Sequence, residues 1–222
     1  MIRKRLIKQN RDLKFNCFLF DWDGCLVDTL PIWFEGMHKG LAHFNIKAPE
    51  DMIKKGFQGW DIFTQLGVSD MGVFTKQVYR YINDNLCNVK FNEGVISTLI
   101  QLKEKGIKSA VVTTTEREKV FSVLDRLNMM DAFDCVIGRN DVKKLKPDRE
   151  AIDRALALIE GDKTSTAIVG DSEVDILAGQ NAGISTIWFS SAENKNFHPH
   201  INEQKLNPDF TINRFHELQK FF

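Results

Sequence analysis

Three carboxylates follow a short apolar run near the start of the chain. Residues 15–20 are almost entirely apolar, and Asp21, Asp23 and Asp28 come soon after them. An apolar run of this length predicts a buried strand, and open α/β sheets bind their ligands beyond the carboxyl ends of such strands. Buried carboxylates are costly unless a cation or hydrogen-bond donors compensate them. The pattern therefore predicts a divalent cation, with one Asp kept free to react; the alternative is a solvated turn, in which Asp and Gly are common.

A second apolar run also ends in acids. Residues 167–169 lead into Gly170 and Asp171, and Asp175 lies one helical turn further on. We interpret Gly170 as the residue that allows a tight turn after the strand. A functional site is favoured here over the alternative, which is a helix N-terminus capped by polar side chains.

Two further segments carry polar groups that are uninformative when each is taken alone. Thr113, Thr114 and Thr115 end a strand-like run with hydroxyls, although Thr is an ordinary strand residue. Lys146 precedes Pro147, which biases the lysine toward extended backbone, although a solvated lysine would also fit this position.

In this order and spacing, the four segments resemble the motifs of the haloacid dehalogenase superfamily of aspartyl phosphotransferases. Asp21-Trp22-Asp23-Gly24 resembles the first motif, Thr113 the second, Lys146 the third and residues 170–175 the fourth. The resemblance covers nearly the whole chain. Each motif is short, but the ordered set is specific.

The resemblance implies a role for each acid of the first and fourth motifs. Asp21 would attack phosphorus and form an aspartyl-phosphate, while Asp23 would protonate the leaving oxygen and later activate water. Mg²⁺ would be held by the carboxylates of Asp21 and Asp171 and by the backbone carbonyl of Asp23. Asp175 would support this metal shell and orient Lys146.

The resemblance also implies how the phosphoryl group would be bound. Thr113 and Lys146 would hold its oxygens, and Thr114 is expected beside them in the substrate site. Two positions depart from the residues common in the family: Thr114, where Asn often follows the motif threonine, and Cys25, where Thr or Val is common. A buried thiol usually behaves as a small apolar side chain, so Cys25 receives no catalytic role.

Short β-rich runs alternate with helix-like segments along the chain. Apolar residues recur at three- and four-residue spacing in residues 95–102, 120–127 and 152–159, between the predicted strands. This alternation predicts an α/β fold, a Rossmann-like doubly wound parallel sheet with helices on both faces. The predicted strands are residues 15–20, 109–113, 135–137, 167–169, 186–189 and a weaker one at 210–212.

One connection is much longer than most connections in α/β units, because residues 29–91 hold no convincing strand. Amphipathic helical patterns fill this segment, which lies where one subclass of the family carries its cap. We predict a small helical cap domain over residues 29–91 and an α/β core made of residues 1–28 and 92–222. Hinges are expected near residues 29–31 and 88–92.

The aromatic residues of the predicted cap are expected to form mostly its own core. The exception is a segment in which two glycines flank polar and aromatic residues, since such a loop could bend toward the active site. Gln58 and Trp60, with Lys54 and Lys55, are the candidate substrate contacts there.

Composition argues against several classes of function. Of the 222 residues, 30 are Lys or Arg and 30 are Asp or Glu, so no overall field attracts nucleic acid or an anionic membrane. No apolar segment approaches the length of a membrane span, and the four cysteines contain no CxxC pair, which predicts a soluble cytoplasmic protein. We interpret the basic residues 1–11 as a solvated arm and His198-Pro199-His200 as a surface loop.

The resulting functional hypothesis is a Mg²⁺-dependent phosphatase acting on a small phosphorylated metabolite: a phosphorylated acid, sugar phosphate, nucleotide or pyrophosphate. One alternative is a sugar-phosphate mutase resembling β-phosphoglucomutase. Two alternatives from other classes are a signalling module that holds a phosphorylated Asp and a catalytically idle binding protein. The cap and Asp23 argue against the signalling module, and the complete motif set argues against the idle protein. The sequence predicts no oligomeric state.

Overall fold

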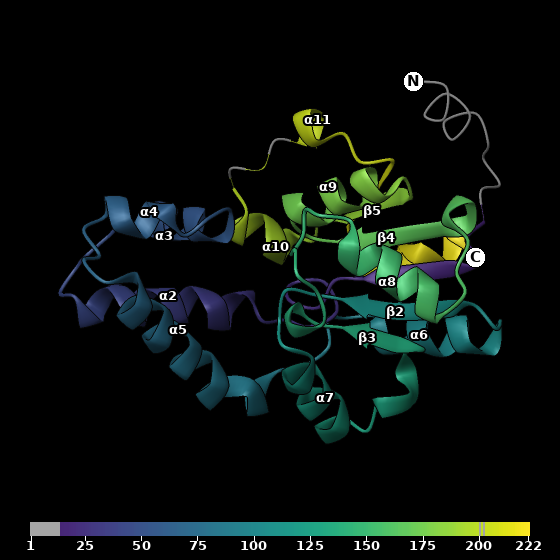
Figure 1. Cartoon of the computed structure of the whole chain (residues 1–222), viewed down its shortest axis with the longest axis horizontal. Helices are drawn as coiled ribbons and strands as arrows, with labels where there is room; N and C mark the ends of the chain where they lie inside the picture. Colours follow the sequence, from purple (N-terminus) through teal and green to yellow (C-terminus); the bar gives the residue numbers. More distant parts are fainter. Residues whose placement is uncertain (1–13, 200, 202) are drawn as a thin grey trace.

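The computed structural model describes residues 14–199, 201 and 203–222, and within them it contains a six-stranded parallel sheet (Figure 1). The strand order is β3-β2-β1-β4-β5-β6, so the chain winds outward from β1 first to one side and then to the other. The predicted α/β fold class is confirmed. The strands are β1 (Cys17–Phe20), β2 (Lys108–Val112), β3 (Cys135–Ile137), β4 (Thr166–Gly170), β5 (Ser185–Phe189) and β6 (Phe210–Ile212).

The central strand β1 is apolar throughout because both of its faces are covered. Phe18 and Phe20 belong to the apolar cluster on one side of the sheet, and Cys17 and Leu19 belong to the cluster on the other side. A strand of a parallel sheet that is buried on both faces reads as a continuous apolar run rather than an alternating one. The same reason explains the buried run of β4, whose residues all lie in the interior.

Helices cover both faces, as the three helical patterns of the core predict. Helices α6, α7 and η6 pack on the side of Phe18, and α8 and α9 pack on the side of Leu19. These elements are α6 (Val95–Glu104), α7 (Arg117–Arg126), η6 (Phe215–Phe221), α8 (Glu150–Leu158) and α9 (Glu173–Ala182).

The long connection after β1 is helical, and its helices lie together beyond one end of the sheet, at the left of Figure 1. They enclose an apolar cluster of their own that includes Met37, Phe63 and Phe74, and α2 packs along α5. The division at residues 29 and 91 stays a prediction. The elements are α2 (Leu30–His43), α3 (Glu50–Lys54), η1 (Lys55–Phe57), α4 (Asp61–Gln65), α5 (Met71–Asn85) and η2 (Leu86–Asn88).

The remaining elements are short. Helices α10 and α11 lie between β5 and β6, where no helix was predicted. Residues 1–11, interpreted above as a solvated arm, lie outside the described residues. Within the described part of the chain, no helix combines the length and apolar character needed to span a membrane. The short elements are η3 (Met130–Ala132), η4 (Arg139–Asp141), η5 (Lys163–Ser165), α10 (Ala192–Phe197) and α11 (Glu203–Leu206).

Candidate active site

Three of the predicted site residues stand at the carboxyl ends of three adjacent strands. Thr113 follows β2, Asp21 follows β1 and Asp171 follows β4, each as the next residue after the strand. The backbone N–H of Asp21 donates to the carbonyl of Val169 at 2.9 Å, so the parallel pairing continues past the end of β1. All three side chains are buried. The sheet register therefore brings together residues that are up to 150 positions apart in the sequence.

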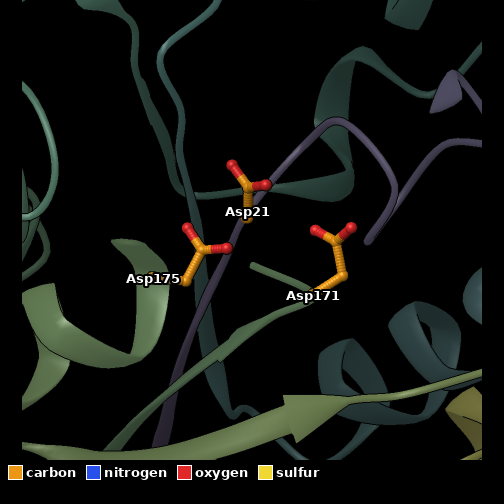
Figure 2. A group of neighbouring side chains, drawn as sticks. All are labelled: Asp21, Asp171 and Asp175. Carbon is orange, nitrogen blue, oxygen red and sulfur yellow. The ribbon is translucent and has the colours of Figure 1, made fainter. Parts of the chain in front are cut away.

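The carboxylates of Asp21, Asp171 and Asp175 form one buried group (Figure 2). One oxygen of each lies within 4.8 Å of the others, and Asp175 comes from the first turn of α9. Burial raises the pKa of Asp21 well above its ordinary value, and the charge of Asp175 raises it further against the opposing effect of Lys146. Burial also raises the pKa of Asp171. A cation at this position would favour the ionised form of all three acids.

Lys146 is the cation that the described structure places within this group. Its Nζ donates to Asp21 Oδ1 at 2.6 Å, to Asp175 Oδ1 at 2.5 Å and to the carbonyl of Val112 at 3.0 Å. Burial alone would lower the pKa of Lys146, but the charges of Asp175 and Asp21 outweigh it and raise the pKa above its usual range. The predicted pairing of Asp175 with Lys146 is present in the structure.

The arrangement fits a divalent cation. Lys146 pairs with Asp21 and Asp175 but not with Asp171, so the three buried acids outnumber the one lysine in a medium where an uncompensated charge is costly. Asp171 Oδ1 is buried and has no hydrogen-bond partner among the described residues. The donors are all carboxylate oxygens, which are the ligands that Mg²⁺ prefers.

Two glycines are required by close contacts at this group. Gly24 has φ +75°, and a Cβ on it would lie 2.3 Å from Asp171 Oδ2. A Cβ on Gly170 would lie 2.3 Å from the Cβ of Asp175. The φ of Gly170 is not in the left-handed region, so the predicted tight turn does not require glycine there. Glycine is required because α9 approaches too closely for a side chain at this position.

Asp23 lies two residues after Asp21 in a separate, half-buried environment. Its Oδ1 accepts hydrogen bonds from Thr29 Oγ1 at 2.7 Å and from Trp33 Nε1 at 2.9 Å, and its Oδ2 accepts from Thr115 Oγ1 at 2.6 Å. These three donors were not predicted. Thr115 lies in a bend after β2, where its backbone N–H donates to Thr113 Oγ1 at 3.0 Å, so the alternation of a strand does not identify it. No local pattern points to Trp33.

Beside these acids, the strand ends and the helices of the insert line a cavity of about 320 Å³ that is open to solvent. Trp60 and Thr114 line it together with Asp21, Asp23 and Asp171, and contact of Trp60 and Thr114 with substrate stays a prediction. Gln58 is exposed and does not line this cavity. Lys54 is buried instead against the core, where its Nζ donates to Asn196 Oδ1 at 3.2 Å.

Arg139 is a cavity residue that was not predicted. It lies in η4, directly after β3, and its Nη1 donates to the Tyr79 hydroxyl of α5 at 2.9 Å. Among the described residues that line the cavity, it is the only Arg or Lys. A single arginine in a loop carries no periodic signal, and its placement depends on the path of the chain after the strand.

The expectation of a surface loop is wrong for His198. Its side chain is 5% exposed, and its Nε2 lies 3.0 Å from Asp171 Oδ2. His200 lies outside the described residues. The physical reason is that α10 carries the chain back to the ends of the strands, which no motif in this segment signals.

Cys25 agrees with its predicted structural role. Its thiol is fully buried and lies 3.4 Å from the carbonyl of Val169, and burial raises the pKa of Cys25 well above its ordinary value. The thiol is therefore protonated near neutral pH, which argues against a nucleophilic role.

Comparisons with known proteins agree with the geometry. The sequence model of the haloacid dehalogenase-like hydrolases matches residues 18–189. Pyrophosphatase PpaX of Bacillus mycoides is 33% identical over 184 residues, which are 80% of this chain and 85% of that protein. Pyrophosphatase PpaX of Anoxybacillus flavithermus is 32% identical over 213 residues, covering 93% of this chain and 96% of that protein.

A solved structure shares the fold. The structure of a predicted phosphoglycolate phosphatase from Haemophilus somnus 129pt has a TM-score of 0.77 and covers 93% of this chain and 97% of its own, at 24% identity. The family match spans well over half of the chain, and the relatives are similar over most of their length. The chain therefore belongs to the haloacid dehalogenase-like hydrolases and is an enzyme of their phosphatase branch.

Proposed function

We propose that this protein is a Mg²⁺-dependent phosphatase that hydrolyses a small phosphorylated metabolite through an aspartyl-phosphate on Asp21. The observation that carries the proposal is the convergence of Asp21 and Asp171 from adjacent strands on one buried cluster with Lys146, beside a cavity that Asp23 also lines. The location agrees with the placement of ligand sites at the carboxyl ends of parallel strands.

The carboxylates divide into those free to hold a cation and one that is already committed. Asp175 accepts from Lys146 through Oδ1 and from the backbone N–H of Ser172 through Oδ2, so both of its oxygens are occupied. Asp171 Oδ1 has no such partner. Asp21 and Asp171, with the backbone carbonyl of Asp23, would therefore hold Mg²⁺, and Asp175 would orient Lys146. When bound, Mg²⁺ would offset the negative charge of the phosphoryl oxygens and of the attacking carboxylate.

The residues of the chain then account for two displacement steps. In the first, an Asp21 oxygen forms a bond to phosphorus while the leaving oxygen departs with a proton from Asp23. In the second, Asp23 takes a proton from a water molecule, the water attacks the phosphorus, and the bond to Asp21 breaks. Thr113 and Lys146 would bind the phosphoryl oxygens, with Thr114 and Trp60 at the edge of the substrate.

We propose that residues 29–91 act as a cap that shields these steps from bulk water. Phe57, Trp60 and Tyr79 of the insert form one wall of the cavity, and the strand ends form the other. Movement of the cap about the predicted hinges, at residues 29–31 and 88–92, would admit substrate and release phosphate.

The cavity favours a compact substrate with a second anionic group. Its volume of about 320 Å³ is at the small end of ligand sites, and Arg139 supplies a cation in its lining. Two relatives are named pyrophosphatases. We therefore place inorganic pyrophosphate first among the candidate substrates, ahead of phosphorylated acids, sugar phosphates and nucleotides.

The test is phosphate release from a panel of phosphorylated metabolites, with and without Mg²⁺, for the wild type and Asp21→Asn. We expect release that needs both the metal and Asp21 and that favours one compound. Metal-independent release, or substantial activity in Asp21→Asn, would contradict the mechanism. Conversion of a sugar phosphate to its isomer without phosphate release would indicate the mutase instead.

A further inference from the structure

His198 reaches the active site from a segment that the catalytic motifs do not include. Helix α10 ends at Phe197, and the next residue places its imidazole Nε2 3.0 Å from Asp171 Oδ2. The two side chains are 5% and 2% exposed. An Asp171 that holds a metal ion is ionised and can only accept hydrogen bonds, and in that state the imidazole Nε2–H is the donor in this contact.

The two residues also share an unusual feature. Among the buried side-chain nitrogen and oxygen atoms of the described residues, Asp171 Oδ1 and His198 Nδ1 are the two without a hydrogen-bond partner. Buried polar atoms are normally paired, so an unpaired carboxylate oxygen beside two other acids indicates a missing ligand. The imidazole occupies one oxygen of Asp171 and leaves the other available.

Both the core and the insert hold the segment that carries His198. On the core side, Asn194 Nδ2 donates to the carbonyl of Gly24 at 2.9 Å. On the side of the insert, the Phe57 ring lies 5.3 Å from the His198 ring and 5.9 Å from the Phe197 ring. The core contact of Asn194 does not depend on the insert, whereas the ring contacts with Phe57 would be present only while the insert is docked on the core.

We propose that His198 is a positioning residue for the metal ligand Asp171. Its Nε2–H donates to Oδ2 and holds the carboxylate so that Oδ1 is directed to the cation. This role of His198 depends on the Mg²⁺ site of the proposed function. Partners of this kind fix the orientation of a ligand and contribute to metal affinity without touching the metal. The contact with Phe57 makes the same residue a link between the docked cap and the metal site.

The experiment is calorimetric titration of the full chain with Mg²⁺, without substrate. Loss of an outer partner of a metal ligand weakens binding by about 10- to 100-fold, so His198→Ala should raise the Kd for Mg²⁺ at least about tenfold. In His198→Gln the side-chain amide can still donate, and its Kd should lie between those of wild type and His198→Ala. His216→Ala, which removes an exposed histidine of η6, should bind as wild type does. Activity of His198→Ala should recover largely at saturating Mg²⁺.

Several results would overturn the proposal. One is an unchanged Kd in a folded His198→Ala protein, and another is a His198→Gln protein that binds as weakly as His198→Ala. Direct coordination would replace positioning if His198→Ala lost affinity for Ni²⁺ far more than for Mg²⁺, because imidazole suits Ni²⁺ whereas Mg²⁺ prefers oxygen ligands. Absence of Mg²⁺ binding in the wild type would instead refute the metal site of the proposed function, so the two failures are distinguishable.

Discussion

Asp21 and Asp23 stand two residues apart at the end of one strand, yet their surroundings differ in kind. Asp21 belongs to an inner cluster of ionisable groups, where Lys146 donates to it at 2.6 Å and two further carboxylates lie close by. Asp23 belongs to an outer cluster of neutral donors, formed by Thr29, Trp33 and Thr115. Both clusters border the cavity, the inner one through Asp21 and Asp171 and the outer one through Asp23.

The difference matches the two chemical tasks proposed for these acids. A nucleophile that must stay ionised is served by cations, because burial raises the pKa of Asp21 well above its ordinary value and a cation acts against that rise. An acid that must alternately give and take a proton is better served by neutral donors, because a fixed cation would hold it ionised. The different surroundings of Asp21 and Asp23 thus suit two side chains of the same type to different chemical roles.

The largest effect should come from removing the nucleophile. We expect Asp21→Asn to lower kcat by roughly 10⁴-fold or more, as loss of the nucleophile does in other covalent mechanisms. The Tm of this variant in the absence of metal should not fall below that of the wild type, because the substitution neutralises one member of a crowded group of acids. Steady-state kinetics and circular dichroism check both points. The exposed Asp28→Asn is the matched control, and an equal loss in that variant would argue against a specific role of Asp21.

A smaller effect is expected at Asp23. General acid–base groups contribute about 10²- to 10⁴-fold, so Asp23→Asn should lower kcat within that range. With an activated leaving group the first step no longer needs the acid, and the phosphorylated protein should accumulate, which mass spectrometry of the intact chain would detect. Normal turnover of ordinary substrates by this variant would show that the proton comes from elsewhere.

Arg139 tests whether the outer region also selects the substrate. A hydrogen bond to a charged group is worth about 1.5–3 kcal/mol, so Arg139→Ala should raise KM for pyrophosphate at least about tenfold. KM for a monoester with an uncharged remainder should change little, and kcat should be largely kept. Arg149→Ala removes an exposed arginine of the core and is the control. Equal changes for both substrates would mean that Arg139 supports the fold rather than recognition.

The smallest effect is expected from Trp33→Phe. This change keeps an aromatic ring against Tyr79 but removes one of the three donors to Asp23. A hydrogen bond of this kind contributes about 0.5–1.5 kcal/mol, so kcat should fall by roughly twofold to tenfold, with the pH profile of kcat displaced. An unchanged profile would show that Thr29 and Thr115 suffice to hold the acid.

Several features of the site could be predicted because they are local. The apolar run of β1 and the run of β4 each specify a buried strand, and the next residue of each is an acid. In a parallel sheet the carboxyl ends of neighbouring strands meet, so Asp21, Asp171 and Thr113 could be placed together before any coordinates were known. The ordered motifs added Lys146, which comes from a loop with no periodicity.

Other features required the tertiary structure. Trp33 reaches Asp23 only because α2 docks over the strand ends, and Arg139 faces the cavity only because of the path taken after β3. His198 was assigned to the surface, although it lies against Asp171.

By itself, the sequence determined the sheet and the inner cluster, because strand burial and strand-end position follow from neighbouring residues along the chain. The tertiary structure alone decided which side chains donate to Asp23, that Arg139 lines the cavity and that His198 contacts Asp171. Each of these depends on which residues of separate elements meet, and the spacing of apolar residues within one element does not specify its partner in another.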